Sequence, residues 1–198
     1  MLLNWLFYPH ICTKSRKKVV IISSSLRGGS NSDILAQAFA KGAGEVGCQV
    51  ESISLKGKAI AFCHGCLQCQ ETKHCLIDDD ANAITAKVLQ ADVVVFASPV
   101  YYYSISGQLK TLLDRMNALY ASDYHFKDVW FLCSAYDDDE NRAPIGSISD
   151  IKGWVSCFEN AKFAGTIFAG GVGGPREASG HVAEHEAYEA GRSLLADD

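Results

Sequence analysis

Four short apolar runs, each followed by polar or glycine-rich residues, constrain the fold of this chain more than any other feature. A continuous apolar run of this length is typical of a strand that is buried on both faces, as in a parallel sheet. Parallel strands need long crossovers, and the intervals between the runs are long enough to hold helices. The runs are VVIISS at 19–24, DVVVFAS at 92–98, DVWFLCS at 128–134 and GTIFAG at 165–170.

Apolar residues at helical spacing fill these intervals, and a weaker strand is expected over 48–55. The helix after the second run has the clearest pattern, since Leu109, Leu112 and Met116 recur on one side and Ser104 is placed to cap its start. Strands that alternate with helices form a parallel sheet with right-handed crossovers. Five strands so arranged predict an α/β, flavodoxin-like, doubly wound parallel sheet in the order 2-1-3-4-5, with helices on both faces. The expected helices cover about 32–46, 80–90, 105–119, 148–158 and 180–196.

Composition indicates one domain over residues 18–198, preceded by a short N-terminal arm, residues 1–17. Of the 198 residues 48% are hydrophobic and 21% charged, so a core can form and disorder is excluded. The net charge of −5 argues against nucleic acid or an anionic membrane as partner, and no apolar run reaches the roughly 20 residues that span a bilayer. The first residues lack the pattern of a secretory signal, so we expect a cytoplasmic protein.

The loop after the first strand is the first candidate site, because ligands of such sheets bind at the carboxyl ends of the strands. It lacks the lysine of a P-loop and the spacing of GxGxxG, which disfavours a nucleoside triphosphatase and a typical dinucleotide site. Hydroxyls, an amide, one arginine and the N–H groups of the next helix can instead hold a single phosphate. A polar loop that only caps the helix is the alternative. The candidate residues are Ser25, Arg27, Ser30, Asn31 and Ser32.

The loop that follows the next buried strand, residues 98–104, carries three consecutive tyrosines. Aromatic side chains can pack on a planar ligand, and backbone groups can bond to the polar edge of a ring. The alternative is that the tyrosines cover apolar surface or join a subunit interface. A phosphate on one loop and a flat ring beside the other indicate a mononucleotide, with FMN as the best candidate.

Eight cysteines divide into one cluster and four isolated positions. The segment 63–75 has the spacing CxxCxxCx5C, and four thiolates on one loop can bind a [4Fe–4S] cluster. Free or redox-active thiols near a flavin, and a zinc site, are the other two interpretations. Cys12 lies in the arm, and we expect Cys48, Cys133 and Cys157 to be buried as small apolar side chains. The candidate metal ligands are Cys63, Cys66, Cys69 and Cys75.

The order of these motifs over residues 18–175 resembles the flavodoxin-like NADPH-dependent FMN reductase superfamily, and most of all its iron–sulfur flavoprotein branch. The resembling segments are SSSLRGGSNSD, the cysteine segment followed by IDDD, and SPVYYYSISGQLKTLLDR. The resemblance implies that FMN is bound, with its phosphate held by the first loop. It also implies ring contacts from the second loop and from the loop after the next strand. The implied ring contacts are Pro99, Val100, Tyr101, Tyr102, Ser134, Ala135 and Tyr136.

The function expected on this basis is an FMN-binding oxidoreductase. It would take electrons from NAD(P)H and pass them to a small acceptor such as a quinone, a nitro or azo compound, or a flavin. The flavin carries the chemistry, so no catalytic side chain is assigned. The alternatives are an iron–sulfur flavoprotein electron carrier that docks with a redox partner such as ferredoxin, and a flavin-free thiol sensor. A homodimer or homotetramer is expected, because the tyrosines offer more apolar surface than one ring buries.

Overall fold

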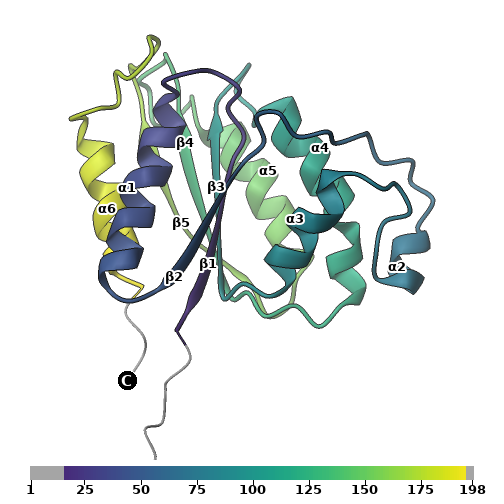
Figure 1. Cartoon of the computed structure of the whole chain (residues 1–198). Coiled ribbons are helices and arrows are strands. Elements are labelled where there is room, and N and C mark those ends of the chain that lie inside the picture. The colour runs from purple at the N-terminus through teal and green to yellow at the C-terminus, as the bar shows by residue number, and fades with distance from the viewer. Residues whose placement is uncertain (1–15, 195–198) are drawn as a thin grey trace, which may run out of the picture.

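A five-stranded parallel sheet runs through the middle of the computed structural model, which describes residues 16–194 (Figure 1). Its strand order, β2-β1-β3-β4-β5, confirms the predicted doubly wound topology. Most of the predicted N-terminal arm, residues 1–15, lies outside the described residues. The strands are β1 (Lys18–Ser23), β2 (Gln49–Ser54), β3 (Val93–Pro99), β4 (Asp128–Ser134) and β5 (Lys162–Ala169).

Helices cover both faces of this sheet. Figure 1 shows α1 (Asn31–Glu45) and α6 (Val182–Arg192) on one side. On the other side lie α3 (Asp80–Leu89), α4 (Gly107–Arg115) and α5 (Ile145–Val155). No helix within residues 16–194 is long and apolar enough to cross a membrane. The remaining short helices are α2 (Gln68–Thr72), which projects beyond this second layer, and the 3-10 helix η1 (Met116–Ala121).

Strand β3 shows why a continuous apolar run predicts a central strand. Val93 and Val95 pack into the hydrophobic cluster under α1 and α6, whereas Val94 and Phe96 pack into the cluster on the opposite face. All four side chains are at most 1% exposed. Burial of each contributes about 1.5–3 kcal/mol, so a polar residue at any of these positions would be costly.

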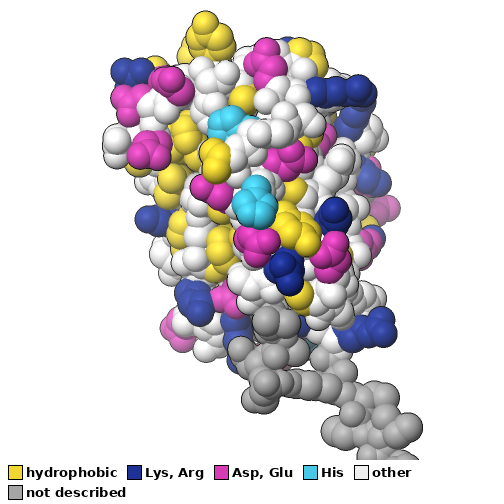
Figure 2. Space-filling view, turned by 90° about the vertical axis from the view of Figure 1, so that its left-hand side faces the viewer, with side chains coloured by type: hydrophobic (Ala, Val, Ile, Leu, Met, Phe, Trp, Pro, Cys, Tyr) yellow, Lys and Arg dark blue, Asp and Glu magenta, His cyan; other side chains and the backbone are white. Residues whose placement is uncertain are grey.

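Two glycines allow α1 and α6 to pack with their backbones in close contact. A Cβ atom at Gly42 would lie 2.1 Å from the carbonyl oxygen of Tyr188. A Cβ atom at Gly191 would likewise lie 2.1 Å from the carbonyl oxygen of Phe39. The face that these helices form carries acidic and basic side chains interspersed with apolar ones (Figure 2).

The start of α4 differs from the prediction. Ser106, not Ser104, caps this helix, and its hydroxyl accepts a hydrogen bond from the Leu109 N–H at 3.3 Å. Residues 101–104 form a separate tight turn, and the Ser104 hydroxyl donates to Asp150 at 2.6 Å. That turn holds Ser104 away from the helix, so the predicted cap was wrong by two positions.

Candidate functional site

The first loop, residues 24–32, connects β1 to the N-terminus of α1 and contains the predicted phosphate donors. Ser25, Ser30 and Ser32 are buried, and the Ser30 and Ser32 hydroxyls lie 3.1 Å apart. Ser30 also caps α1, because its hydroxyl accepts from the Asp33 N–H at 3.4 Å. The hydroxyls therefore lie at the helix end whose unpaired N–H groups and dipole favour an anion.

Asn31 joins this loop to the segment that follows β5. Its amide donates to the carbonyl oxygens of Val172 at 3.2 Å and Gly174 at 2.9 Å. Its amide oxygen accepts from the Ala178 N–H at 3.1 Å. Both N–H groups of the amide are thus engaged within the protein. Asn31 positions the loop, and the predicted phosphate donors that remain are the three hydroxyls, the backbone N–H groups and Arg27.

Arg27 and a second arginine lie where the same two segments meet. Nη1 of Arg27 donates to the carbonyl oxygen of Gly173 at 2.8 Å. Arg176 donates its backbone N–H to the carbonyl oxygen of Gly29 at 2.9 Å, and its side chain lies against that glycine. Sequence reasoning missed Arg176, since only the folded chain brings residues 147 positions apart together. The sequence does carry one signal for it, because Arg176 lies in the glycine-rich segment that follows a buried strand.

The second loop, which follows β3, and the third loop, which follows β4, lie at the same end of the sheet, because the strands are parallel. The Val100 N–H donates to the Ser134 carbonyl oxygen at 2.9 Å, which joins the two loops. Tyr102 is fully exposed, Tyr101 is 52% exposed, and Tyr136 lies against Gly173 in the segment after β5. Of the predicted ring contacts, Pro99 ends β3 and Ser134 ends β4. The others follow in the two loops, namely Val100, Tyr101, Tyr102, Ala135 and Tyr136.

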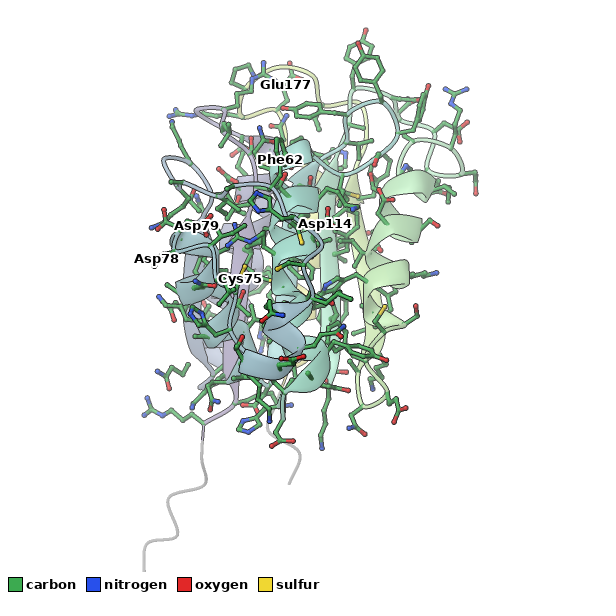
Figure 3. All side chains as sticks on the ribbon, turned by 90° about the vertical axis from the view of Figure 1, so that its right-hand side faces the viewer. Phe62, Cys75, Asp78, Asp79, Asp114 and Glu177 are labelled. Carbon is green, nitrogen blue, oxygen red and sulfur yellow. The ribbon has the colours of Figure 1, made fainter. Side chains whose placement is uncertain are left out.

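The cysteine segment lies on a different side of the molecule. Figure 3 shows Cys75 and Asp79 beside α4, well below Glu177, which lies among the loops at the strand ends. The four clustered thiols line one cavity of about 510 Å³. Apolar side chains form much of its remaining wall, including Leu113, Trp154 and Phe158. The lining thiols of the segment are Cys63, Cys66, Cys69 and Cys75.

A fifth thiol lines this cavity. Cys157 was predicted to be buried, but it is exposed, because α5 ends at Val155 and leaves the residue in the turn beyond. Cys133 is fully buried as predicted, and burial raises the pKa of its thiol well above the usual value. Cys48 is only partly buried.

The cysteine segment has the right donors for an iron–sulfur cluster. All seven cysteines in the part of the chain that the structure describes are free thiols. Five of them line one cavity, and four of these five belong to the cysteine segment. Four thiolates are the usual ligand set of a [4Fe–4S] cluster. Within residues 16–194 no group of three or more Cys, His, Asp or Glu side chains is gathered closely enough to hold a metal ion. The donor set therefore fits such a cluster in kind and number, while the thiols are not drawn together.

Arg115 holds both ends of the cysteine segment. This residue is 2% exposed, and Nη1 donates to the Ala61 carbonyl oxygen at 2.9 Å. Nη2 donates to the Ile77 carbonyl oxygen at 3.0 Å. The two terminal nitrogens also bond to both oxygens of Asp79, at 2.6 and 3.0 Å. The same guanidinium interacts with Cys75, so a buried positive charge lies next to one predicted ligand.

The charge state of Asp79 follows from this arrangement. Burial alone would raise the pKa of its carboxyl group. The hydrogen bonds from Arg115 and from the N–H groups of Ala61 and Ala81 outweigh burial and hold the pKa below its ordinary value. Asp79 is therefore ionised at neutral pH and balances the charge of the buried arginine.

Comparison with known proteins connects these sites to one family. The model of the family described as NADPH-dependent FMN reductase matches residues 17–140. An iron-sulfur flavoprotein of Methanocaldococcus jannaschii is 39% identical over 102 residues, 52% of this chain and 53% of that relative. The chain thus spans about half the length of this curated relative. A putative NAD(P)H-dependent FMN-containing oxidoreductase of Bacillus subtilis is 28% identical over 189 residues, 90% of this chain and 96% of that one.

Solved structures support the fold. An NAD(P)H:quinone oxidoreductase from Methanothermobacter marburgensis superposes with a TM-score of 0.72 over 93% of this chain and 100% of its own, at 18% identity. An azoreductase from Bacillus anthracis gives a TM-score of 0.69 over 90% and 100%, also at 18% identity. Because the family model covers more than half of its residues, this chain belongs to the NADPH-dependent FMN reductase family.

Proposed function

We propose that this chain is an FMN-binding oxidoreductase that takes electrons from NAD(P)H and passes them to a small acceptor. The observation that carries the proposal is the meeting of two loops at the switch point between β1 and β3. One loop offers anion donors at a helix N-terminus, and the other offers aromatic rings and backbone groups. Family membership supports the same reading. The candidate acceptors are quinones, nitro and azo compounds, and flavins.

The chain's own residues would bind and orient the cofactor. Ser25, Ser30, Ser32 and Arg27 would donate to the phosphate, together with the first N–H groups of α1. The loops at 98–104 and 134–136 would contact the ring. When bound, FMN supplies the group that accepts a hydride and later releases electrons. Position and electrostatics are therefore the contribution of the protein, and no side chain is given an acid–base role.

We further propose that Cys63, Cys66, Cys69 and Cys75 hold a [4Fe–4S] cluster. The shared cavity, the free thiols and the positive charge of Arg115 support this assignment. The name of the M. jannaschii relative points the same way. Ligand binding would draw the four sulfurs together, since a loop with little core of its own can curl around a metal.

An electron carrier that docks with a redox protein is the second candidate. The exposure of Cys63 and Cys66 favours it, because a cluster at the surface can exchange single electrons with a partner. Steady-state oxidation of NADPH and NADH separates the candidates. Sustained turnover with a quinone or an azo dye supports the enzyme, whereas flavin reduction only through a ferredoxin supports the carrier.

Self-association is part of the proposal. Four tyrosines are at least half exposed around the second and third loops, and this apolar surface suits a contact between copies of the chain. They are Tyr101, Tyr102, Tyr103 and Tyr136. Light scattering at micromolar concentration should give the mass of a homodimer or homotetramer, and a monomer mass would remove this part of the proposal.

A further inference from the structure

Arg176 is attached to the first loop although it belongs to the segment after β5. Its backbone N–H donates to the Gly29 carbonyl oxygen at 2.9 Å, and its own carbonyl oxygen accepts from the Ser179 N–H at 3.1 Å. These two bonds fix its backbone. Its neighbour Glu177 appears in Figure 3 among the loops at the end of the sheet. The backbone of Arg176 is therefore held in place beside the predicted phosphate site.

The backbone of Arg176 has a conformation that favours glycine. Its φ is +66°, and nearby Gly171 and Gly180 have φ values of +71° and +79°. A side chain at positive φ is strained, and such strain clusters at functional positions where the surroundings hold it in place. A glycine would adopt this backbone conformation without strain, yet the chain has an arginine at this position.

The side chain of Arg176 covers Gly29, which lies in the first loop. A Cβ atom at Gly29 would be 3.1 Å from Cγ and 3.4 Å from Nε of Arg176. Among the described residues this guanidinium makes no ion pair and no side-chain hydrogen bond. The adjacent Glu177 carboxylate instead accepts from the Gly174 N–H at 2.8 Å. Arg176 thus brings an unpaired positive charge to this loop.

Charge balance indicates what this cation binds. A phosphate monoester carries about −1.5 to −2 charges near pH 7, so Arg27 alone leaves part of that charge unmatched. Asp33 is an acidic residue in the first turn of α1, next to the first loop. Its carboxyl group accepts a hydrogen bond from the Ser23 hydroxyl, and burial raises its pKa. Arg176 offers a second positive charge beside this loop, and a hydrogen bond from a guanidinium to a phosphate is stronger than one between neutral groups.

We propose that Arg176 is a second phosphate-binding arginine, which acts with Arg27 and makes the site select FMN over riboflavin. This inference rests on the proposed FMN site. A guanidinium can donate to phosphate oxygens, whereas riboflavin offers no such partner. Arg176 should therefore change the affinity for FMN and leave the affinity for riboflavin as it is.

Arg176→Gly is the informative variant, because it removes the cation and relieves the strained backbone at once. A loss of affinity then cannot come from added strain. The protein, freed of cofactor, is titrated separately with FMN and with riboflavin at low and high salt. We expect the Kd for FMN to rise about three- to tenfold at low salt, since water screens part of the attraction at an exposed site. The Kd for riboflavin should stay within about twofold.

Two further variants control the result. Arg176→Lys keeps the charge and the strained backbone, and it should recover part of the FMN affinity. Lys127→Ala removes another exposed cation, which directly precedes β4 at the opposite end of the sheet from these loops. It should bind FMN like the unchanged protein.

Three outcomes overturn the inference. One is an unchanged FMN affinity in Arg176→Gly, and another is an equal weakening of FMN and riboflavin, which would mark a structural role. The third is an equal effect of Lys127→Ala, which would show that Arg176 acts only through the overall charge of the protein. A protein that binds neither flavin overturns the proposed function itself, and this result is distinct from the other three.

Discussion

The Ser106 hydroxyl donates to the Ser24 hydroxyl at 2.8 Å, and both side chains are fully buried. Ser24 in turn donates to the Ala97 carbonyl oxygen at 3.1 Å. The N–H of Ser106 donates to the Ser98 hydroxyl at 3.0 Å. These bonds tie the first loop to the second loop and to the start of α4. They set the separation of the two loops that would hold FMN.

Ser106→Ala should loosen this connection. The variant loses the cap of α4 and leaves the Ser24 hydroxyl with one partner fewer, so we expect a loss of about 1–3 kcal/mol in the free energy of unfolding. FMN affinity should fall as well. Urea denaturation and FMN titration measure the two effects. Ser156→Ala, an exposed serine that bonds to the Gly153 carbonyl oxygen, is the control and should change neither.

Arg27→Ala should weaken FMN binding by about tenfold, the lower end of what one charge-assisted hydrogen bond contributes. The sequence alone makes Arg27 the sole cation of the loop and suggests an effect of up to about a hundredfold. Arg176 changes that expectation, because a second cation stays in place. Fluorescence titration with FMN gives the affinity. An unchanged Kd would remove Arg27 from the site.

Iron binding should depend on Arg115. Anaerobically prepared protein is expected to contain about four irons per chain if the cysteine segment holds a [4Fe–4S] cluster. Arg115→Lys keeps the charge but cannot donate to Ala61, Ile77 and both oxygens of Asp79 together, so iron content should fall. Iron analysis measures this.

Arg115→Ala is the more severe change, because it leaves the Asp79 carboxylate without its partner. A loss of about 3–5 kcal/mol in the free energy of unfolding is expected. The control is Lys110→Ala, which removes an exposed ion pair with Asp114 and should cost no more than about 1 kcal/mol. Equal iron content in the unchanged and Arg115→Lys proteins would show that iron binding does not need the hydrogen bonds of Arg115 to Ala61, Ile77 and Asp79.

The lowered pKa of Asp79 implies that the free energy of unfolding decreases in acid. Because its pKa is lower in the folded protein, its contribution is complete above the unfolded value, near 3.9, and is lost as pH falls through the folded pKa. The urea midpoint of the unchanged protein should therefore decrease as the pH is lowered below about 4. Asp79→Asn should be less stable at pH 7 and should show a shallower drop. Parallel pH curves for the two proteins would contradict this assignment.

The fold was predictable because strands such as β1 and β3 are buried on both faces and leave an unbroken apolar run in the sequence. Right-handed crossovers left few possible strand orders, and five strands in a chain of this length suited the flavodoxin-like one. Local details were less accessible. The five-residue helix α2 has no apolar periodicity, and the cap of α4 shifted from Ser104 to Ser106 because a separate tight turn precedes the helix.

The candidate site was predictable only where its residues follow one another in the chain. The candidate phosphate loop and the cysteine segment stand out in the sequence because each is a contiguous motif. Arg176, Arg115 and Cys157 reach these sites through tertiary contacts, which spacing does not encode. Asn31 illustrates the reverse case, since a polar side chain in the right motif turned out to hold two loops together.

The visible absorption spectrum of the FMN-loaded protein, recorded without oxygen before and after NADPH or NADH is added, tests the central claim most directly. Protein mixed with FMN and then desalted should retain about one flavin per chain, with two absorption bands that bleach on addition of the nucleotide. Protein that emerges from desalting without flavin bands, or whose bands stay unchanged with both nucleotides, would contradict the account.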